Sequence, residues 1–70
     1  MNKQELILNW LQNNPGPHFS DEIAVAVGLS EFATRTTLRG LLATNKIIAL
    51  ELQREVAETI VTELAYEYVK

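Results

Sequence analysis

Two arginines and a threonine carry the clearest candidate chemistry in the sequence. Arg35, Thr36 and Arg39 are spaced one and four residues apart, so on a helix they project from one exposed stripe. A guanidinium can donate two hydrogen bonds to guanine O6 and N7 or grip a phosphate, and a threonine can contact the methyl group of thymine. The stripe therefore predicts contact with DNA. The alternative is a solvated helix face on which Arg35 or Arg39 pairs with Glu31 in a surface salt bridge.

Neighbouring residues extend this candidate DNA surface. Ser30, Phe32 and Ala33 lie in the first turn of the same predicted helix, directly before the arginine stripe. Phe32 has the alternative interpretation of a core residue or part of a partner surface. Lys46 follows the helix, and Arg54 is the one cation of the segment that comes next. These five residues complete the predicted DNA-binding set.

A phosphate site is a second candidate, at the start of a helix predicted from Ser20. Free backbone N–H groups at a helix N-terminus attract anions, and Ser20 and His18 could add hydrogen bonds to a phosphate. The alternative is that Ser20 only caps the helix, which Asp21 and Glu22 in the first turn favour.

Catalytic and metal chemistry find no support in the sequence. The chain has no cysteine and a single histidine, which leaves no set of residues with metal-ligand spacing. It also has no glycine-rich phosphate loop, no nucleophile paired with a base, and no carboxylate pair held in a cleft. We therefore predict a protein that is not an enzyme and binds neither a metal nor a cofactor.

The net charge of −3 argues against nucleic-acid binding, because neutralisation of phosphates dominates such binding. The distribution of the charges weakens that objection. Residues 1–46 are neutral overall, and the acidic excess lies in residues 47–70. Between Glu31 and Glu51 there is no acidic residue, and the cations in that interval are Arg35, Arg39 and Lys46. One face of the protein can therefore be cationic.

The first two thirds of the 70-residue chain predict three helices within a single domain, 1–70. Helix 3–13 begins at a capping pair, Asn2 and Glu5, and ends before two prolines. Helix 20–28 stops at Gly28. Recognition helix 30–44 follows, with Ser30 as its N-cap, Asn45 as its C-cap and an inward face formed by Thr34, Thr37, Leu38, Leu41 and Leu42.

Residues 46–69 fit two different structures. Ile60, Leu64, Tyr66 and Tyr68 share one face at a period of two, in a stretch rich in β-branched and aromatic residues, which predicts a hairpin. Apolar residues also recur every four positions from Leu52 to Tyr68, and residues 53–58 hold no Gly, Pro, Asn or Asp for a turn. Taken alone, the segment fits a C-terminal helix equally well.

The order of elements and the run from Glu22-Ile23-Ala24 to Gly28-Leu29-Ser30 resemble the winged helix-turn-helix superfamily of bacterial transcription regulators. The resemblance extends over nearly the whole chain to the very small regulators of fimbrial operons, with an aromatic at Phe32 and an arginine at Arg35. It implies an α+β fold, in which a three-helix winged helix-turn-helix ends in a β-hairpin, the wing, over residues 46–69. The alternative is an all-α helix-turn-helix with a C-terminal helix. Two features depart from the pattern: Gly40 inside the third helix, and the scarcity of cations in the wing, where Arg54 stands beside Glu55 and Glu58.

The resemblance implies a DNA-binding transcription regulator that reads the major groove of double-stranded DNA with its third helix. One small domain contacts little DNA, so we expect a homodimer or a second DNA-binding protein as partner. The alternative function is a winged-helix protein–protein interaction module with no direct DNA binding, which the net charge and the poor wing favour. No apolar run suits a membrane span and the N-terminus does not resemble a signal peptide, so we expect a cytoplasmic protein without membrane contact.

Overall fold

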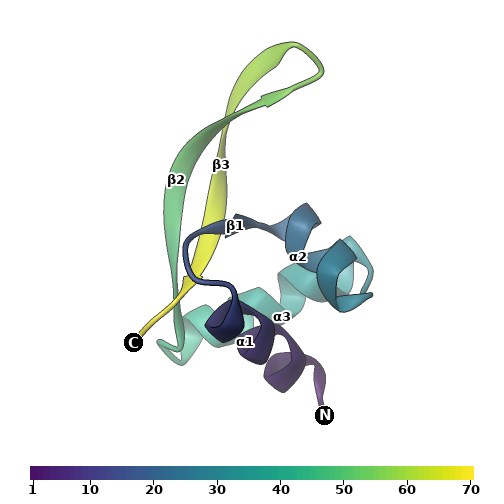
Figure 1. Cartoon of the computed structure of the whole chain (residues 1–70), viewed down its shortest axis with the longest axis vertical. Coiled ribbons are helices and arrows are strands. Elements are labelled where there is room, and N and C mark those ends of the chain that lie inside the picture. Colours follow the sequence, from purple (N-terminus) through teal and green to yellow (C-terminus); the bar gives the residue numbers. More distant parts are fainter.

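The computed structural model describes residues 1–70 as an α+β fold in which three helices pack at one end of a long antiparallel hairpin (Figure 1). The sheet has the strand order β1-β3-β2 and is antiparallel throughout. In chain order the elements are α1 (Lys3–Asn13), β1 (His18–Phe19), α2 (Ser20–Val27), α3 (Glu31–Ala43), β2 (Ile47–Val56) and β3 (Thr59–Tyr68).

The first helix has the predicted bounds, and its capping pair is present. The Asn2 side chain accepts a hydrogen bond from the Glu5 backbone N–H at 2.8 Å, and the Glu5 carboxylate accepts one from the Asn2 N–H at 3.3 Å. These bonds satisfy two of the N–H groups that a helix start leaves free. Ile7 and Leu11 on the inner face of α1 are fully buried.

The second helix begins at Ser20 as predicted, but its capping residue and its end differ from the prediction. Its N-cap is Phe19, so the expectation that Ser20 caps the helix is wrong. Phe19 has an extended backbone because it pairs with β3 as part of β1, which leaves Ser20 as the first helical residue. The helix ends at Val27, one residue before the predicted end, because Gly28 adopts a left-handed φ of 73°.

The third helix is one residue shorter at each end than predicted. Ser30 is its N-cap as predicted, but Thr44 is its C-cap, so the expectation for Asn45 is wrong by one position. Asn45 follows the cap with a left-handed φ of 58°. The N–H of Lys46 donates to the Leu41 carbonyl at 3.0 Å, and this bond reverses the chain into β2.

The C-terminal segment is a hairpin, and the alternative of a C-terminal helix is wrong. Every residue of β2 faces one of β3, from Ile47 opposite Tyr68 to Val56 opposite Thr59. The two-residue turn consists of Ala57 and Glu58, whose φ values of 50° and 65° are both positive. Strand pairing and burial of the strand bases against the helices outweigh the four-residue periodicity.

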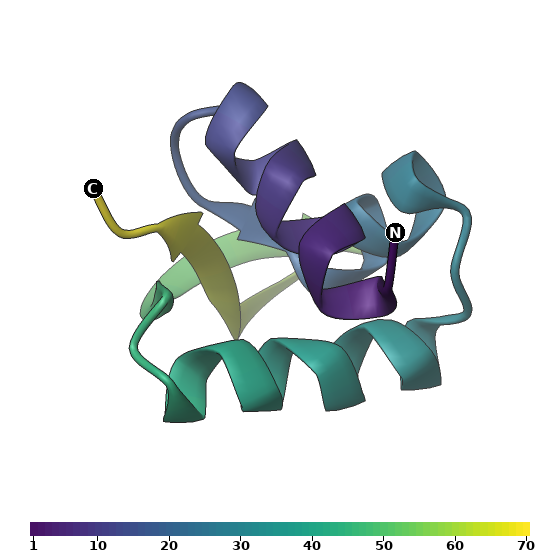
Figure 2. The same cartoon turned by 90° about the horizontal axis from the view of Figure 1, so that it is seen from below.

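The core lies between the three helices and the base of the hairpin (Figure 2). Tyr66 and Tyr68 pack against it, and they share one face of the sheet with Leu64 and Ile60, as predicted. That face is covered only near its base, because Leu64 is 46% exposed and Ile60 is 61% exposed. The six buried residues of the core cluster are Ile7, Leu11, Ile23, Leu38, Leu41 and Ile47. None of the helices has the length and apolar character needed to cross a membrane.

Candidate functional site

The candidate site is the outer face of α3, which the local sequence fixes at both ends. At its start the Ser30 Oγ accepts a hydrogen bond from the Ala33 N–H at 3.1 Å. The preceding turn is tight, because Leu29 donates its N–H to the Ala24 carbonyl at 3.0 Å beside left-handed Gly28. Helices α2 and α3 are thus joined by only residues 28–30.

The two faces of α3 divide as the spacing predicts. Its inner face carries Thr34, Thr37, Leu38 and Leu41, all of which are buried. Arg35, Thr36 and Arg39 are exposed on the outer face, so the structure places the predicted stripe together on one accessible surface. Phe32 is 82% exposed beside it, whereas Ala33 at the edge of this face is half-buried.

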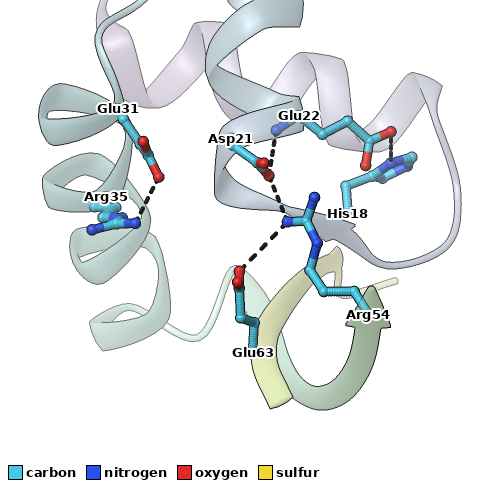
Figure 3. Close-up of polar contacts among 7 residues, drawn as sticks. All are labelled: His18, Asp21, Glu22, Glu31, Arg35, Arg54 and Glu63. Atoms are coloured by element: carbon cyan, nitrogen blue, oxygen red, sulfur yellow. Dashed lines mark hydrogen bonds and ion pairs between the residues drawn. The ribbon is translucent and has the colours of Figure 1, made fainter. Parts of the chain in front are cut away.

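The cations of this region differ in how freely they could meet a ligand. An Arg35 Nη2–Glu31 Oε1 contact of 2.6 Å forms the predicted surface salt bridge, and both side chains are about half exposed (Figure 3). Arg39 and Lys46 are exposed and form no ion pair. Thr36 donates its hydroxyl to the Phe32 carbonyl at 3.0 Å, so its methyl group is the part available for an apolar contact. An exposed pair such as Arg35 and Glu31 contributes only roughly 0.2–1 kcal/mol, and a phosphate could displace the carboxylate.

Arg54 is occupied within the protein. Its Nη1 donates to Asp21 Oδ1 at 2.9 Å and to Glu63 Oε2 at 3.4 Å (Figure 3), and its guanidinium lies 4.2 Å from the centre of the Phe19 ring. The hydrogen bond from Arg54 lowers the pKa of Asp21, and the same bond raises the pKa of Arg54. Arg54 therefore ties the hairpin to the start of α2, away from the outer face of α3.

His18 is also held by its neighbours. Its Nδ1 lies 2.9 Å from Glu22 Oε2 and its Nε2 lies 2.9 Å from the Asn14 carbonyl, while its ring packs edge-on against Trp10 at 4.7 Å between centres. Both ring nitrogens of His18 therefore already have polar partners within the protein. Of the two predicted phosphate candidates, Ser20 and His18, the histidine side chain is therefore already bound to the carboxylate of Glu22.

The start of α2 carries further negative charge. Asp21 accepts the N–H of Glu22 at 2.9 Å in addition to the bond from Arg54, and Ser20 is half-buried without a side-chain hydrogen bond. Two carboxylates at this terminus complement the helix dipole and would repel a phosphate. The predicted phosphate residues Ser20 and His18 therefore lie beside two negative charges, Asp21 and Glu22, which disfavour phosphate binding.

The hairpin is acidic over its length. Arg54 is its only cation, and its glutamates are Glu51, Glu55, Glu58, Glu63 and Glu67. Sequence reasoning identified this imbalance but missed the contacts of Arg54, because Asp21 lies 33 residues away in the chain. The structure contains no group of three or more His, Cys, Asp or Glu arranged to hold a metal ion.

Comparisons with protein-family models, with curated proteins and with solved structures find no match to this chain. The resemblance to winged helix-turn-helix regulators thus stays a prediction drawn from the sequence pattern.

Proposed function

We propose that the chain is a winged helix-turn-helix protein of the cytoplasm that regulates transcription by placing the outer face of α3 in the major groove of double-stranded DNA. The observation that carries the proposal is the common exposure of Arg35, Thr36 and Arg39 on a helix whose opposite face is buried. Arginines can read guanine bidentately, and a helix presented in this way fits the major groove. Lys46 lies beyond the C-terminal end of α3, where it could contact a phosphate.

The geometry narrows the residues proposed for this role. Ser30, Phe32 and Ala33 lie in the first turn of α3 and remain candidates for contact within the groove. Arg54 and His18 are left out, because their side chains are bound to carboxylates elsewhere in the protein. Glu31 lies on the same face as the arginines and opposes their effect on phosphates.

Titration of short duplexes with the purified chain at two salt concentrations tests the proposal. Arg39→Ala should weaken binding about 5- to 150-fold if Arg39 reads a base. Glu31→Gln should tighten binding, because it releases Arg35 and removes a negative charge from the face. Lys3→Ala removes one positive charge from the exposed start of α1, outside the proposed DNA surface, and serves as the matched control. The proposal fails if the wild-type chain binds no better at low salt than an Arg35→Ala/Arg39→Ala variant.

The second candidate function is a protein–protein interaction module without direct DNA binding. Two observations favour it: the hairpin lacks a free cation, and two large apolar side chains are exposed, Val25 of α2 at 84% and Phe32 of α3 at 82%. A surface of this kind suits an apolar partner. If Phe32→Ser abolishes capture of a partner protein while the arginine variants leave every duplex titration unchanged, this second function is favoured.

A further inference from the structure

The outer edge of the sheet is a long, unpaired strand. β2 is the edge strand in the order β1-β3-β2, and it pairs with β3 alone along all ten of its residues. Figure 1 shows no helix beyond β2 on the side away from β3, and only the C-terminal tail passes there, at the base of the strand. The strand contains no proline and its pairing is unbroken, so it lacks two of the common devices that prevent another strand from pairing with such an edge.

One face of this edge strand is also apolar. Ile48, Leu50, Leu52 and Val56 point to the same side of the sheet along β2, and Arg54 is the one charged residue on that side, between Leu52 and Val56. Ile48 is 45% exposed, Leu50 36% and Val56 42%, and Leu52 is half-buried. The isolated chain thus leaves both the backbone groups and an apolar stripe of the same strand open to water.

We propose that two copies of the chain associate through β2, which pairs antiparallel with its counterpart about a two-fold axis at Leu52. In this register Leu52 faces Leu52 of the second copy, and Ile48 faces its Val56. On the opposite side of the sheet Glu51 faces Gln53 of the second copy. The pairing covers all of residues 48–56, and no two like charges lie directly opposite each other.

The other symmetric registers are worse. An axis at Glu51 places the two Glu51 carboxylates opposite each other, and an axis at Arg54 does the same with two guanidiniums. An axis at Gln53 places Glu51 of each copy opposite Glu55 of the other. An axis at Leu50 avoids like charges but leaves residues 54–56 without partners. An axis between two residues would pair side chains from opposite faces of the sheet. The charge pattern of β2 is therefore complementary to itself in one full-length register.

This arrangement closes on itself. The interface uses the same strand of both copies, and the other edge of the sheet, β1, has only two residues. We expect dimers without larger assemblies. In the dimer two α3 helices are related by a two-fold axis, which would favour a palindromic DNA site; that consequence rests on the proposed function, whereas the association itself does not.

Sedimentation equilibrium of the purified full chain without DNA tests the association, with a dimer as the expected result. Gln53→Glu sets two new pairs of like charges across the axis and should weaken the dimer about 2- to 30-fold. Adding Glu51→Lys converts both pairs into opposite charges and should restore association. Gln12→Glu makes the same substitution on the exposed surface of α1 and should change nothing.

The inference is overturned by a monomer at every concentration, by assemblies larger than dimers, or by a dimer whose dissociation constant is the same for Gln53→Glu and Gln12→Glu. A monomer that pairs its β2 only with an extended peptide of another protein would also overturn it. Because DNA is absent, failure here leaves the duplex titrations to decide the DNA proposal separately.

Discussion

The hairpin turn stores backbone strain that can be released by substitution. Ala57 and Glu58 both have positive φ, 50° and 65°, and both side chains are exposed. A turn with two positive φ values is usually built from Asn-Gly, because a β-carbon crowds the carbonyl in the left-handed region. We predict that Ala57→Asn/Glu58→Gly stabilises the fold.

The size of the gain follows from two opposing effects. The left-handed conformation costs roughly 1–2 kcal/mol for an ordinary residue, and Glu58→Gly removes that cost. Glycine also gives the unfolded chain more conformational freedom, which takes back about 0.5–1 kcal/mol. Asparagine tolerates the region better than alanine, by about 0.5 kcal/mol. The net gain is about 0.5–2 kcal/mol, which corresponds to a Tm about 2–16 °C higher for a domain of this size.

Thermal and urea unfolding followed by circular dichroism would measure this difference. Glu58→Gln is the control, because it removes the same negative charge but keeps a side chain at the strained position. Backbone strain in the turn is refuted if the double variant has the Tm of wild type, or if Glu58→Gln raises Tm as much. Amide NMR signals that move only for residues near the turn, and stay in place along the rest of the hairpin, would show that the turn alone had changed.

Three further substitutions test other parts of the fold. Gly40→Ala should stabilise α3 by about 0.5–1 kcal/mol in urea unfolding, because the new β-carbon would meet only the end of the flexible Gln4 side chain, whose Nε2 would lie 2.8 Å away. Thr34→Val should stabilise by about 1 kcal/mol in the same assay, because the Thr34 hydroxyl is buried without a hydrogen-bond partner. Asp21→Asn should destabilise the protein at neutral pH, and this difference should disappear in acid. The hydrogen bond from Arg54 lowers the pKa of Asp21 below its ordinary 3.8. The stabilisation is therefore present above that value and is lost as the pH falls through the pKa of the folded state.

Each of these has an outcome that contradicts it. If Gly40→Ala is destabilising even in a Gln4→Ala background, the side chain of Gln4 is not the reason that position 40 disfavours a β-carbon. A loss of stability in Thr34→Val would mean that its hydroxyl has a partner, such as a buried water. If the difference in stability between wild type and Asp21→Asn persists unchanged at low pH, the negative charge of Asp21 is not its cause.

Local signals in the sequence predicted the helices well, because each carries its own start and stop chemistry. Asn2 with Glu5, Gly28 and Ser30 each act through residues no more than four positions away. The phase of α3 was predictable for the same reason, since its apolar residues recur at the helical period. The outer stripe of the candidate site follows directly from that phase.

The hairpin was predicted from its period-two pattern together with the resemblance, but its own residues fitted a helix equally well. Ala57 and Glu58 lack the usual turn chemistry, so the sequence between the strands gave no sign of a reversal. The contact between Arg54 and Asp21 depends on how the hairpin folds back over α2, and no local pattern encodes it. Pairing of Arg35 with Glu31 was predictable as an alternative, because the two residues lie one helical turn apart.

The pairing of β1 with β3 has a consequence for the order in which the chain folds. Residues 18–19 can pair only with residues 65–66, so this part of the sheet joins positions far apart in the sequence. The helices depend mostly on nearby residues and can form early, whereas such distant pairing is slow to find. During synthesis the helices emerge first, and the apolar surface that Tyr66 and Tyr68 cover stays open until the last strand leaves the ribosome. We expect this protein to be most accessible to chaperones and proteases while its helices have emerged and its last strand has not.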